Sequence, residues 1–489
     1  MIKNAAISHL LLRGSAAGAL AASLGACGHL PIKQPAFESM AVQRAGLPAD
    51  WTLAPMTGDT NAMIADYSVF GDAQLTAYIQ ESLENNRTIR GALENVRQSE
   101  ALLKQTRSGL FPSLNASVGA RTSAPVDDLG SNSDNYSFNI VGAYSPDILG
   151  DLSASIQASV AGLRSTEATY ELARRQLAAQ VARAYFAVIE QKLQLELDRR
   201  TLARAQDTYR ITETRFEAGS VARDELVLGE SSLATSEDSI IASEASVRSA
   251  VRALEILLGR FPQNKLTVSA GLPQPPPTPP LALPELTIRS RPDVVAAEYN
   301  LIQVFAQNRV ARLSRWPQLN ADLGLVLANQ TINSTTDLFD IDGLALSIGV
   351  SLAQTIFDGG AISGRIESAD AAQRRALEQY GQSIIDAYGD VVNAIDQFNT
   401  LQSRSRSLQT ASDAARETVR LGELRYNEGS QNLLDLISVR DRADGQESLL
   451  ISNRRARLEQ WIALHQSLGG DPTQAVPLAT AADSAEGAE

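Results

Sequence analysis

Two short stretches far apart in the chain carry the same pattern of residues. RYNEGSQNLLDLI (residues 425–437) lies 210 residues after RFEAGSVARDELV (residues 215–227), with Arg, Gly, Ser and Leu in register and an aromatic residue after each Arg. At the same spacing, LEILLGRFP (residues 254–262) matches LHQSLGGDP (residues 464–472). Matches repeated in order at one spacing indicate two copies of a structural unit, so both halves should adopt one fold.

A third match fixes the extent of the copies. FPSLNASVG (residues 111–119) aligns with WPQLNADLG (residues 316–324) at a spacing of 205, so the second copy gains five residues before Gly360. Between the copies, GLPQPPPTPP favours an extended polyproline-like connection, and the Ala-rich acidic end of the chain is typical of disorder. We therefore predict a first repeat at 70–270, a linker at 271–284, a second repeat at 285–472 and a disordered tail at 473–489.

The hydrophobic period within each copy predicts very long helices. Residues 152–214 contain no proline and carry a seven-residue repeat from Val181 to Phe216, which predicts a coiled-coil helix about 95 Å long. In the second copy this repeat is apolar only at its ends, and Ser405 and Ser412 occupy the middle positions. We expect the second helix to pack less regularly there.

Between the helices, the period falls to two residues. Alternating apolar residues predict strands at 319–328 and 344–353, and the first copy repeats them more weakly at 114–118 and 136–144. Such a hairpin commonly covers the core of a soluble protein, but strands of about 10 to 12 residues can also cross a bilayer. Four strands cannot close a barrel, so the membrane alternative requires several protomers to pool their strands.

Composition argues against several classes of function. The net charge of −13 disfavours a nucleic-acid partner, because phosphate binding needs clustered Lys and Arg. With three histidines and one cysteine, a metal site or a Cys-His nucleophile would be hard to assemble, and neither GxxxxGK[ST] nor GxGxxG occurs. Residue counts leave carboxylate chemistry open, but we predict no enzyme, no metal and no cofactor.

The N-terminus resembles a lipoprotein signal. Basic residues precede the small, apolar run GSAAGALAAS, which leads to LGAC at residues 24–27. This resembles the lipobox of bacterial lipoproteins and predicts a signal peptide at 1–26, diacylglycerol and palmitate on Cys27, and a lipid-anchored extended segment at 27–69; the alternative is an incidental thiol. Gly28, by the same resemblance, favours the outer membrane. The chain has no later run of about 18 apolar residues.

With these parts in order, the sequence resembles the TolC family of outer-membrane efflux channels, in particular its NodT-type lipoprotein branch. The resemblance runs from residue 47 to residue 472, and its carriers are FGDAQL, FPSL and WPQL before the strands, DILG and IFDGG after them, RPDV, and the two tips RFEAGS and RYNEGS. It implies a mainly α fold with β: long coiled-coil helices forming an α-barrel, and a membrane β-barrel of four strands per protomer closed by trimerisation.

The resemblance also implies a function. The chain would be the outer-membrane channel of a tripartite efflux system: a homotrimer, lipid-anchored and extending into the periplasm. It would passively conduct small molecules, such as drugs and toxic compounds, from a periplasmic adaptor and an inner-membrane resistance-nodulation-division pump. The alternative is a lipid-anchored structural or adaptor coiled-coil protein, but a single adaptor hairpin would not repeat across the whole chain.

Site residues follow from the family's pattern at the two tips. The constricting acidic residue, six positions after the second tip glycine, corresponds to Asp435, with an ordinary solvated carboxylate as the alternative. The family's clasp would join Tyr426 to Glu225. Ser438 and Gln431 replace a second acidic and a basic position, so a second acidic ring and an inter-protomer salt bridge are not supported. The tip residues expected to contact the adaptor are Arg215, Gly219, Ser220, Arg425, Gly429 and Ser430.

Overall fold

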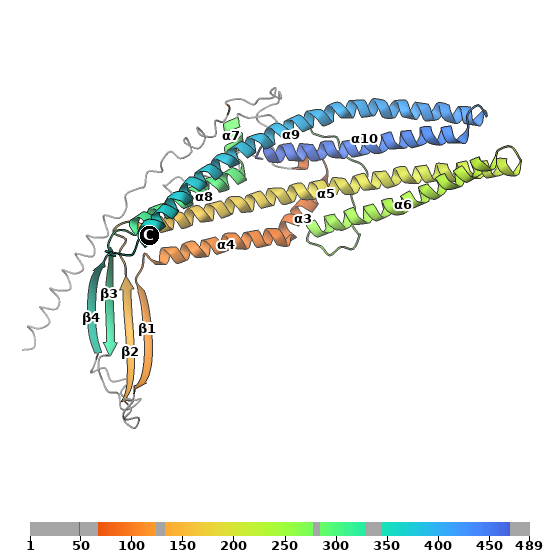
Figure 1. Ribbon diagram of the computed structural model, residues 1–489. Coiled ribbons are helices and arrows are strands. Elements are labelled where there is room, and N and C mark those ends of the chain that lie inside the picture. Colours follow the sequence, from red (N-terminus) through yellow and green to blue (C-terminus); the bar gives the residue numbers. More distant parts are fainter. Residues whose placement is uncertain (1–47, 49–66, 124–132, 277–283, 328–343, 470–489) are drawn as a thin grey trace, which may run out of the picture. The chain divides into compact units, whose positions relative to one another are not determined.

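The fold is seen in a computed structural model of the chain (Figure 1). It describes residue 48 and residues 67–123, 133–276, 284–327 and 344–469. The predicted signal peptide, Cys27, most of the predicted segment 27–69, part of the predicted linker and the predicted tail lie outside the described residues. A search of the described helices found none long and apolar enough to cross a membrane.

Both copies follow the same order of elements, as the repeat predicts. After a short 3-10 helix, Tyr67–Phe70, the first copy contains α3 (Ala73–Asn85), α4 (Arg87–Ser108), β1 (Ser113–Ser123), β2 (Ser133–Tyr144), α5 (Asp151–Glu217) and α6 (Arg223–Leu257). The second contains α7 (Pro284–Arg289), α8 (Pro292–Leu313), β3 (Gln318–Leu327), β4 (Leu344–Ala353), α9 (Ala361–Asn427) and α10 (Leu433–Ser467). The long helices α5 and α9 have 67 residues each, and α6 and α10 have 35 each.

The chain forms two compact units, and each unit takes parts from both copies. Of the described residues, the strand-bearing unit includes 96–123, 133–166, 297–327 and 344–380, and the helical unit includes 67–95, 167–276, 284–296 and 381–469. The repeat boundaries predicted from the sequence describe the duplication, whereas the spatial units cut across it. Each unit is described by itself below.

In the strand-bearing unit, the four strands form one antiparallel sheet in the order β1-β2-β3-β4 (Figure 1). The two hairpins join through β2 and β3, where Gly142 pairs with Leu323, and Leu323 in turn pairs with Ile348 of β4. The strands are 11, 12, 10 and 10 residues long, which confirms the strands predicted from the alternating residues. Sheet formation therefore brings the two copies together in one element.

In the helical unit, two antiparallel pairs, α5 with α6 and α9 with α10, lie side by side (Figure 1). Their apolar core is built around Phe70, Phe186 and Trp461, with ring centroids 5.1 Å apart for Phe70 and Phe186 and 5.0 Å apart for Phe70 and Trp461. Edge-on aromatic contacts at these distances add to the free energy gained by burying the rings. This core lies at the middle of α5 and near the end of α10 that is far from its hairpin tip.

The predicted heptad is buried in the core but not along its whole length. Val181 and Val188 are fully buried, whereas Phe216, beside the tip, is 37% exposed. In α9 the heptad serine Ser412 is only 1% exposed. At this position, the less regular packing expected in the middle of α9 consists of a polar side chain in a buried, inward-facing position.

Candidate functional site

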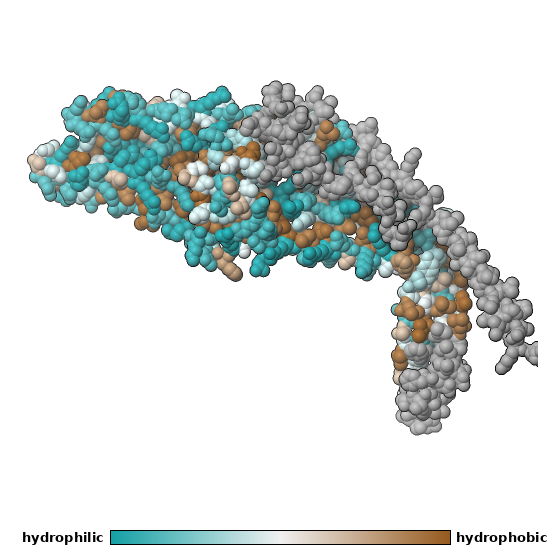
Figure 2. Space-filling view, turned by 180° about the vertical axis from the view of Figure 1, so that it is seen from behind, coloured by the Kyte–Doolittle hydropathy of each residue, from teal (hydrophilic) through white to brown (hydrophobic). Residues whose placement is uncertain are grey.

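The sheet has one apolar face and one polar face. Its apolar side chains are strongly exposed, with Leu114 at 77%, Ile348 at 74% and Leu352 at 69% exposure, and Figure 2 shows such side chains gathered over the strands. The opposite face carries residues such as Asn320 and Ser351, which pair directly across β3 and β4. An exposed apolar face of this kind is suited to lipid rather than to water.

The sheet is also open at both edges. Within the described residues, β1 pairs only with β2 and β4 pairs only with β3. Unpaired strand edges leave backbone N–H and C=O groups without partners, which is costly wherever water is absent. The sheet is thus complete only when another strand pairs with each edge.

The hairpin tips predicted from the sequence are tight turns of similar geometry. Gly219 and Gly429 adopt positive φ angles of 71° and 74°. In the first tip, Ser220 N–H donates to the Arg215 carbonyl at 2.8 Å, and in the second, Ser430 N–H donates to the Arg425 carbonyl at 2.9 Å. These bonds end α5 and α9 in the manner of a Schellman motif, which requires glycine at the left-handed position.

The helices that follow the two tips begin differently. Asn432 caps α10, because its side-chain oxygen accepts the backbone N–H of Asp435 at 2.8 Å. The corresponding residue before α6 is Ala222, which makes no side-chain cap. Asp435 itself is exposed in the first turn of α10, where the helix dipole favours a negative charge.

The proposed clasp residue Tyr426 lies in a small apolar cluster that spans both hairpins. It packs with Leu433 and Leu436 of its own hairpin and with Leu228 of the other, and the Arg215 guanidinium lies over its ring at 5.0 Å. Its hydroxyl is buried and has no hydrogen-bond partner among the described residues. In this structure the contact across the tips is therefore a cation–π contact with Arg215 and not a hydrogen bond to Glu225.

Away from the tips, a polar seam joins α5 to α10. We define it by the pairs Arg204–Asp444, at 2.6 Å, and Arg200–Glu447, at 2.7 Å, to which Thr201 adds a hydrogen bond to Asp444 at 2.8 Å. Burial opposes ionisation of Glu447, but the hydrogen bond and charge of Arg200 and the charge of Arg416 hold its pKa below the ordinary value.

The seam was not predicted from the sequence, although its spacing gave a usable signal. Arg200 and Arg204 are four residues apart on α5, and Asp444 and Glu447 are three apart on α10, so each pair lies on one helix face. The seam is incompletely bonded, since Arg204 Nε is buried without an acceptor. Beside it lies a small polar cavity of about 40 Å³.

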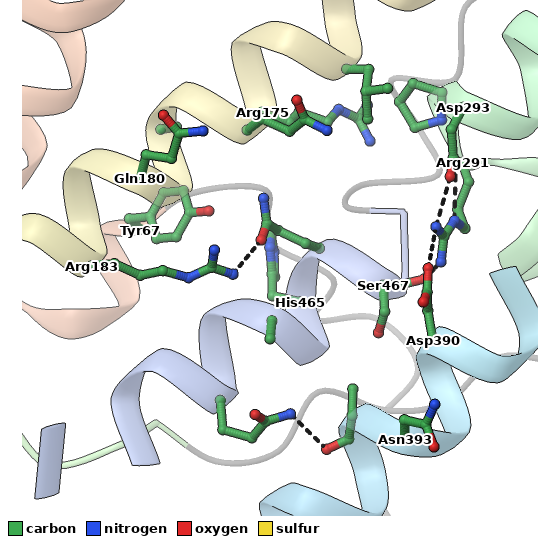
Figure 3. Close-up of a pocket in the computed structure, with 18 of the residues that line it drawn as sticks. Tyr67, Arg175, Gln180, Arg183, Arg291, Asp293, Asp390, Asn393, His465 and Ser467 are labelled. Atoms are coloured by element: carbon green, nitrogen blue, oxygen red, sulfur yellow. Dashed lines mark hydrogen bonds and ion pairs between the residues drawn. The ribbon is translucent and has the colours of Figure 1, made fainter. Parts of the chain in front are cut away.

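A larger polar cavity, of about 750 Å³, lies elsewhere in the helical unit (Figure 3). On one side Arg291 is held by Asp293 at 2.7 Å and by Asp390 at 2.9 Å, and on another Arg183 donates to Gln466 at 2.7 Å. Burial disfavours the charge of Asp293, but the bond and charge of Arg291 lower its pKa. The RPDV motif therefore supplies a structural ion-pair network that ties the start of α8 to α9.

The described residues do not form a metal centre. Among them, no three His, Cys, Asp or Glu side chains are grouped so that they could hold a metal ion. The features that stand out are instead the two-faced sheet, the long paired helices and the tips. Together they are typical of a subunit of a membrane channel.

Comparisons with known proteins identify the family. The family model "Outer membrane efflux protein" matches residues 78–260 and 283–470, and the chain belongs to this family. It is thus an outer-membrane component of an efflux system, a function it shares with its relatives. The two matched segments correspond to the two repeats seen in the sequence.

Similar proteins cover almost the whole chain. The pyoverdine export outer membrane protein OpmQ of Pseudomonas aeruginosa is 27% identical over 474 residues, which is 91% of this chain and 94% of that protein. The outer membrane protein OprJ of the same organism is 26% identical over 481 residues, covering 94% and 95%. Among solved structures, the open state of the Neisseria gonorrhoeae MtrE channel has a TM-score of 0.78 and 23% identity, covering 91% of this chain and 98% of that one.

Proposed function

We propose that the protein is the passive conduit of a tripartite efflux system and works as a homotrimer. Three protomers would pool their four-stranded sheets into one membrane barrel, and their long helices would continue the passage into the periplasm. The observation that carries this proposal is the sheet, because its exposed apolar face suits lipid, its polar face suits a water-filled lumen, and its two open edges call for further strands.

The conduit would carry out no chemical step of its own. An inner-membrane resistance-nodulation-division pump and a periplasmic adaptor would supply the energy and the cargo. The relatives' names point to cargoes as different as pyoverdine, cations and toluene, which supports a wide passage that selects little. We therefore place the choice of small molecule, such as a drug or toxic compound, upstream of this protein.

The oligomer and its conductance can be tested together. The protein purified in detergent should have the mass of three protomers, measured by light scattering with correction for bound detergent. The same preparation should conduct ions in planar lipid bilayers. A stable monomer that gives no conductance would refute the proposal.

At the tips, we propose that Asp435 narrows the passage. Its exposed carboxylate in the first turn of α10 would repel its two symmetry copies and attract cations. Replacing Asp435 by Ala should raise conductance or weaken the block by multivalent cations. Glu428→Ala, which removes an exposed acid on the same tip, is the matched control. If Asp435→Ala changes neither property, the gate assignment is wrong.

We also propose that Tyr426 and Glu225 form a clasp in the closed channel. The buried Tyr426 hydroxyl lacks a partner here, so a hydrogen bond would remove the cost of leaving it unpaired. Tyr426→Phe deletes only this hydroxyl and should increase the open fraction in single-channel records. An open fraction equal to that of the unaltered protein would exclude the clasp. The surrounding tip residues, including the exposed Arg425, would contact the adaptor.

For the N-terminus, we propose that Cys27 carries diacylglycerol and palmitate and anchors the chain in the outer membrane. The lipobox-like LGAC at residues 24–27 supports this assignment. In cells fed radioactive palmitate, the unaltered protein should be labelled and Cys27→Ser should not. Labelling that persists in the variant would place the lipid elsewhere.

A further inference from the structure

The large polar cavity of the helical unit contains a buried hydrogen-bond donor without an acceptor. Tyr67 lines this cavity of about 750 Å³, and its side chain is only 8% exposed. Among the described residues, no group accepts a hydrogen bond from its hydroxyl, which Figure 3 shows directed toward the middle of the cavity. A buried donor of this kind costs free energy unless a bound molecule accepts its hydrogen bond.

The Tyr67 hydroxyl is held in a fixed position and stays protonated. Its ring stacks on Phe70, with centroids 6.4 Å apart, and lies 5.9 Å from the ring of His465. Burial raises the pKa of the hydroxyl above its ordinary value, although the positive charges of Arg183 and Arg175 act in the opposite direction. Tyr67 is therefore a hydrogen-bond donor at neutral pH.

Beside this hydroxyl, Arg183 has a neutral partner. It donates to the side-chain oxygen of Gln466 at 2.7 Å and makes no ion pair within the described residues (Figure 3). The charge of Glu459 acts at Arg183, but Glu459 forms its ion pair with Arg455, at 3.1 Å. The cavity thus presents a positive charge close to the unused donor of Tyr67.

The rest of the lining offers neutral polar groups. Its two aspartates, Asp293 and Asp390, both bind Arg291 on another side of the cavity. Six carboxamide side chains also line it, and each has both a donor and an acceptor: Gln176, Gln180, Asn393, Gln397, Gln460 and Gln466. This lining suits a ligand that has one negative charge and several hydrogen-bonding groups.

We propose that the cavity binds a small carboxylate that also carries amide or hydroxyl groups. The carboxylate accepts hydrogen bonds from Tyr67 and Arg183, and the carboxamides bind the other polar groups. A phosphate would bring a second negative charge that this side of the cavity does not balance, and an apolar anion would leave the carboxamides without partners. The inference goes beyond the proposed function, because the cavity lies within one protomer and binding requires no passage through the trimer.

Trp461 provides a signal for binding, since its ring stacks on His465 with centroids 5.3 Å apart. The chain has two other tryptophans, so the full-length trimer in detergent would carry Trp51→Phe and Trp316→Phe. The acidic probes are N-acetylalanylalanine and glucuronate. Their neutral counterparts, of nearly the same size, are the C-terminal amide of the peptide and the methyl ester of the sugar acid.

At least one acid should change the Trp461 emission saturably, with one molecule bound per protomer by calorimetry. Its neutral counterpart should bind at least tenfold more weakly. Binding of the peptide alone would identify peptide ends as the source of the carboxylate, and binding of glucuronate alone would identify sugar acids. The absence of saturable binding by both acids, or equal binding of an acid and its neutral counterpart, would overturn the proposal.

Two variants test the contacts with the carboxylate. Tyr67→Phe deletes only the hydroxyl and should weaken binding of the acid roughly tenfold. Arg183→Gln should weaken it by about the same factor or more and remove the preference for the acid over its neutral counterpart. The control Arg404→Gln, which removes a positive charge from an exposed position on α9, should bind like the unaltered protein.

Unchanged affinity in a Tyr67→Phe variant that still forms the trimer would refute the position of the carboxylate. A preference for the acid that survives in Arg183→Gln would refute the charge contact. Conductance in bilayers is measured separately, so a protein that binds the acid but does not conduct would reject the proposed channel and retain this site. A protein that conducts but binds neither acid would reject the site alone.

Discussion

Breaking the polar seam should loosen the half of α10 that lies next to the tip. Asp444 makes a two-oxygen contact with Arg204 at 2.6 Å and accepts a hydrogen bond from Thr201 at 2.8 Å, with its side chain only 18% exposed. Replacing Asp444 by Ala removes these bonds and leaves Arg204, whose buried Nε already lacks an acceptor, without a carboxylate partner. Because Arg204 is one-third exposed, the expected cost is about 1–2 kcal/mol, at the lower end for charged hydrogen bonds.

Amide hydrogen exchange can measure this cost locally. In the trimer in detergent, exchange in the first half of α10 should accelerate roughly 5- to 30-fold, since 1.4 kcal/mol is a factor of ten. Amides around Trp461, within the apolar core, should keep their rates. The matched control is Arg420→Ala, which breaks the exposed Arg420–Glu417 pair on α9 and should leave α10 unchanged.

A double-mutant cycle decides whether the pair itself is responsible. Arg204→Ala and Asp444→Ala should each accelerate exchange, and the double variant should exchange more slowly than the two single effects combined predict. The difference reports the coupling between the two side chains. Fully additive effects would mean that Arg204 and Asp444 do not stabilise the seam through each other, and the reasoning would be wrong.

Three further perturbations test other parts of the structure. Gly429→Ala should destabilise the second tip by about 1–2 kcal/mol, because Gly429 has a positive φ angle. The control Gly445→Ala, at a position in open space within α10, should stabilise the helix slightly. Amide exchange measured at the tip and along α10 distinguishes the two effects. Ile348→Arg on the apolar face of the sheet should make the free energy of membrane insertion less favourable by about 2–4 kcal/mol if the residue lies near the bilayer centre. The effect is measured as a lower yield of heat-resistant trimer. The control Ser351→Arg, on the polar face, should have much less effect. The lowered pKa of Glu447 means that its stabilising effect is present above its unfolded pKa, about 4.3, and is lost as the pH falls through the folded value. The protection factors of the amides at the seam, which are corrected for the slower intrinsic exchange in acid, should therefore fall, and protection factors that stay constant from about pH 6 to pH 3 would contradict this.

The sequence predicted the elements because their signals are local. The alternation at 344–353 gave β4 to the residue, and the proline-free stretch 152–214 gave α5 within three residues at each end. Gly219 and Gly429 marked the tips because a helix that ends in a Schellman motif needs a residue that tolerates positive φ. Each of these signals depends on neighbours in the chain and not on distant contacts.

The contacts between elements were harder to predict, because they depend on how helices are rotated against one another. Arg204 and Asp444 are 240 residues apart, and neither residue alone indicates its partner. The contact between Tyr426 and Arg215 shows the same limit, since the family pattern suggested only Glu225 as a partner of Tyr426, and that clasp stays a prediction. Glu225 and Arg215 both belong to the first hairpin. Which of them faces Tyr426 depends on how that hairpin packs, through Leu228, against the cluster that contains Leu433 and Leu436.

The two copies of the hairpin differ in structure at their tips through a few changes of residue. Asn432 caps α10 and Tyr426 anchors an apolar cluster in the second copy, whereas the first copy has Ala222 without a side-chain cap and the exposed Phe216. The second tip thus contains its own small core, and the first tip contributes to that core through Arg215 and Leu228. Because the contact at the tips is made by a ring, a guanidinium and a few apolar side chains, we expect the hairpins to separate more readily at this end than around Trp461. We therefore expect the more easily opened contacts to lie at the tips, where the proposed gate residue Asp435 lies.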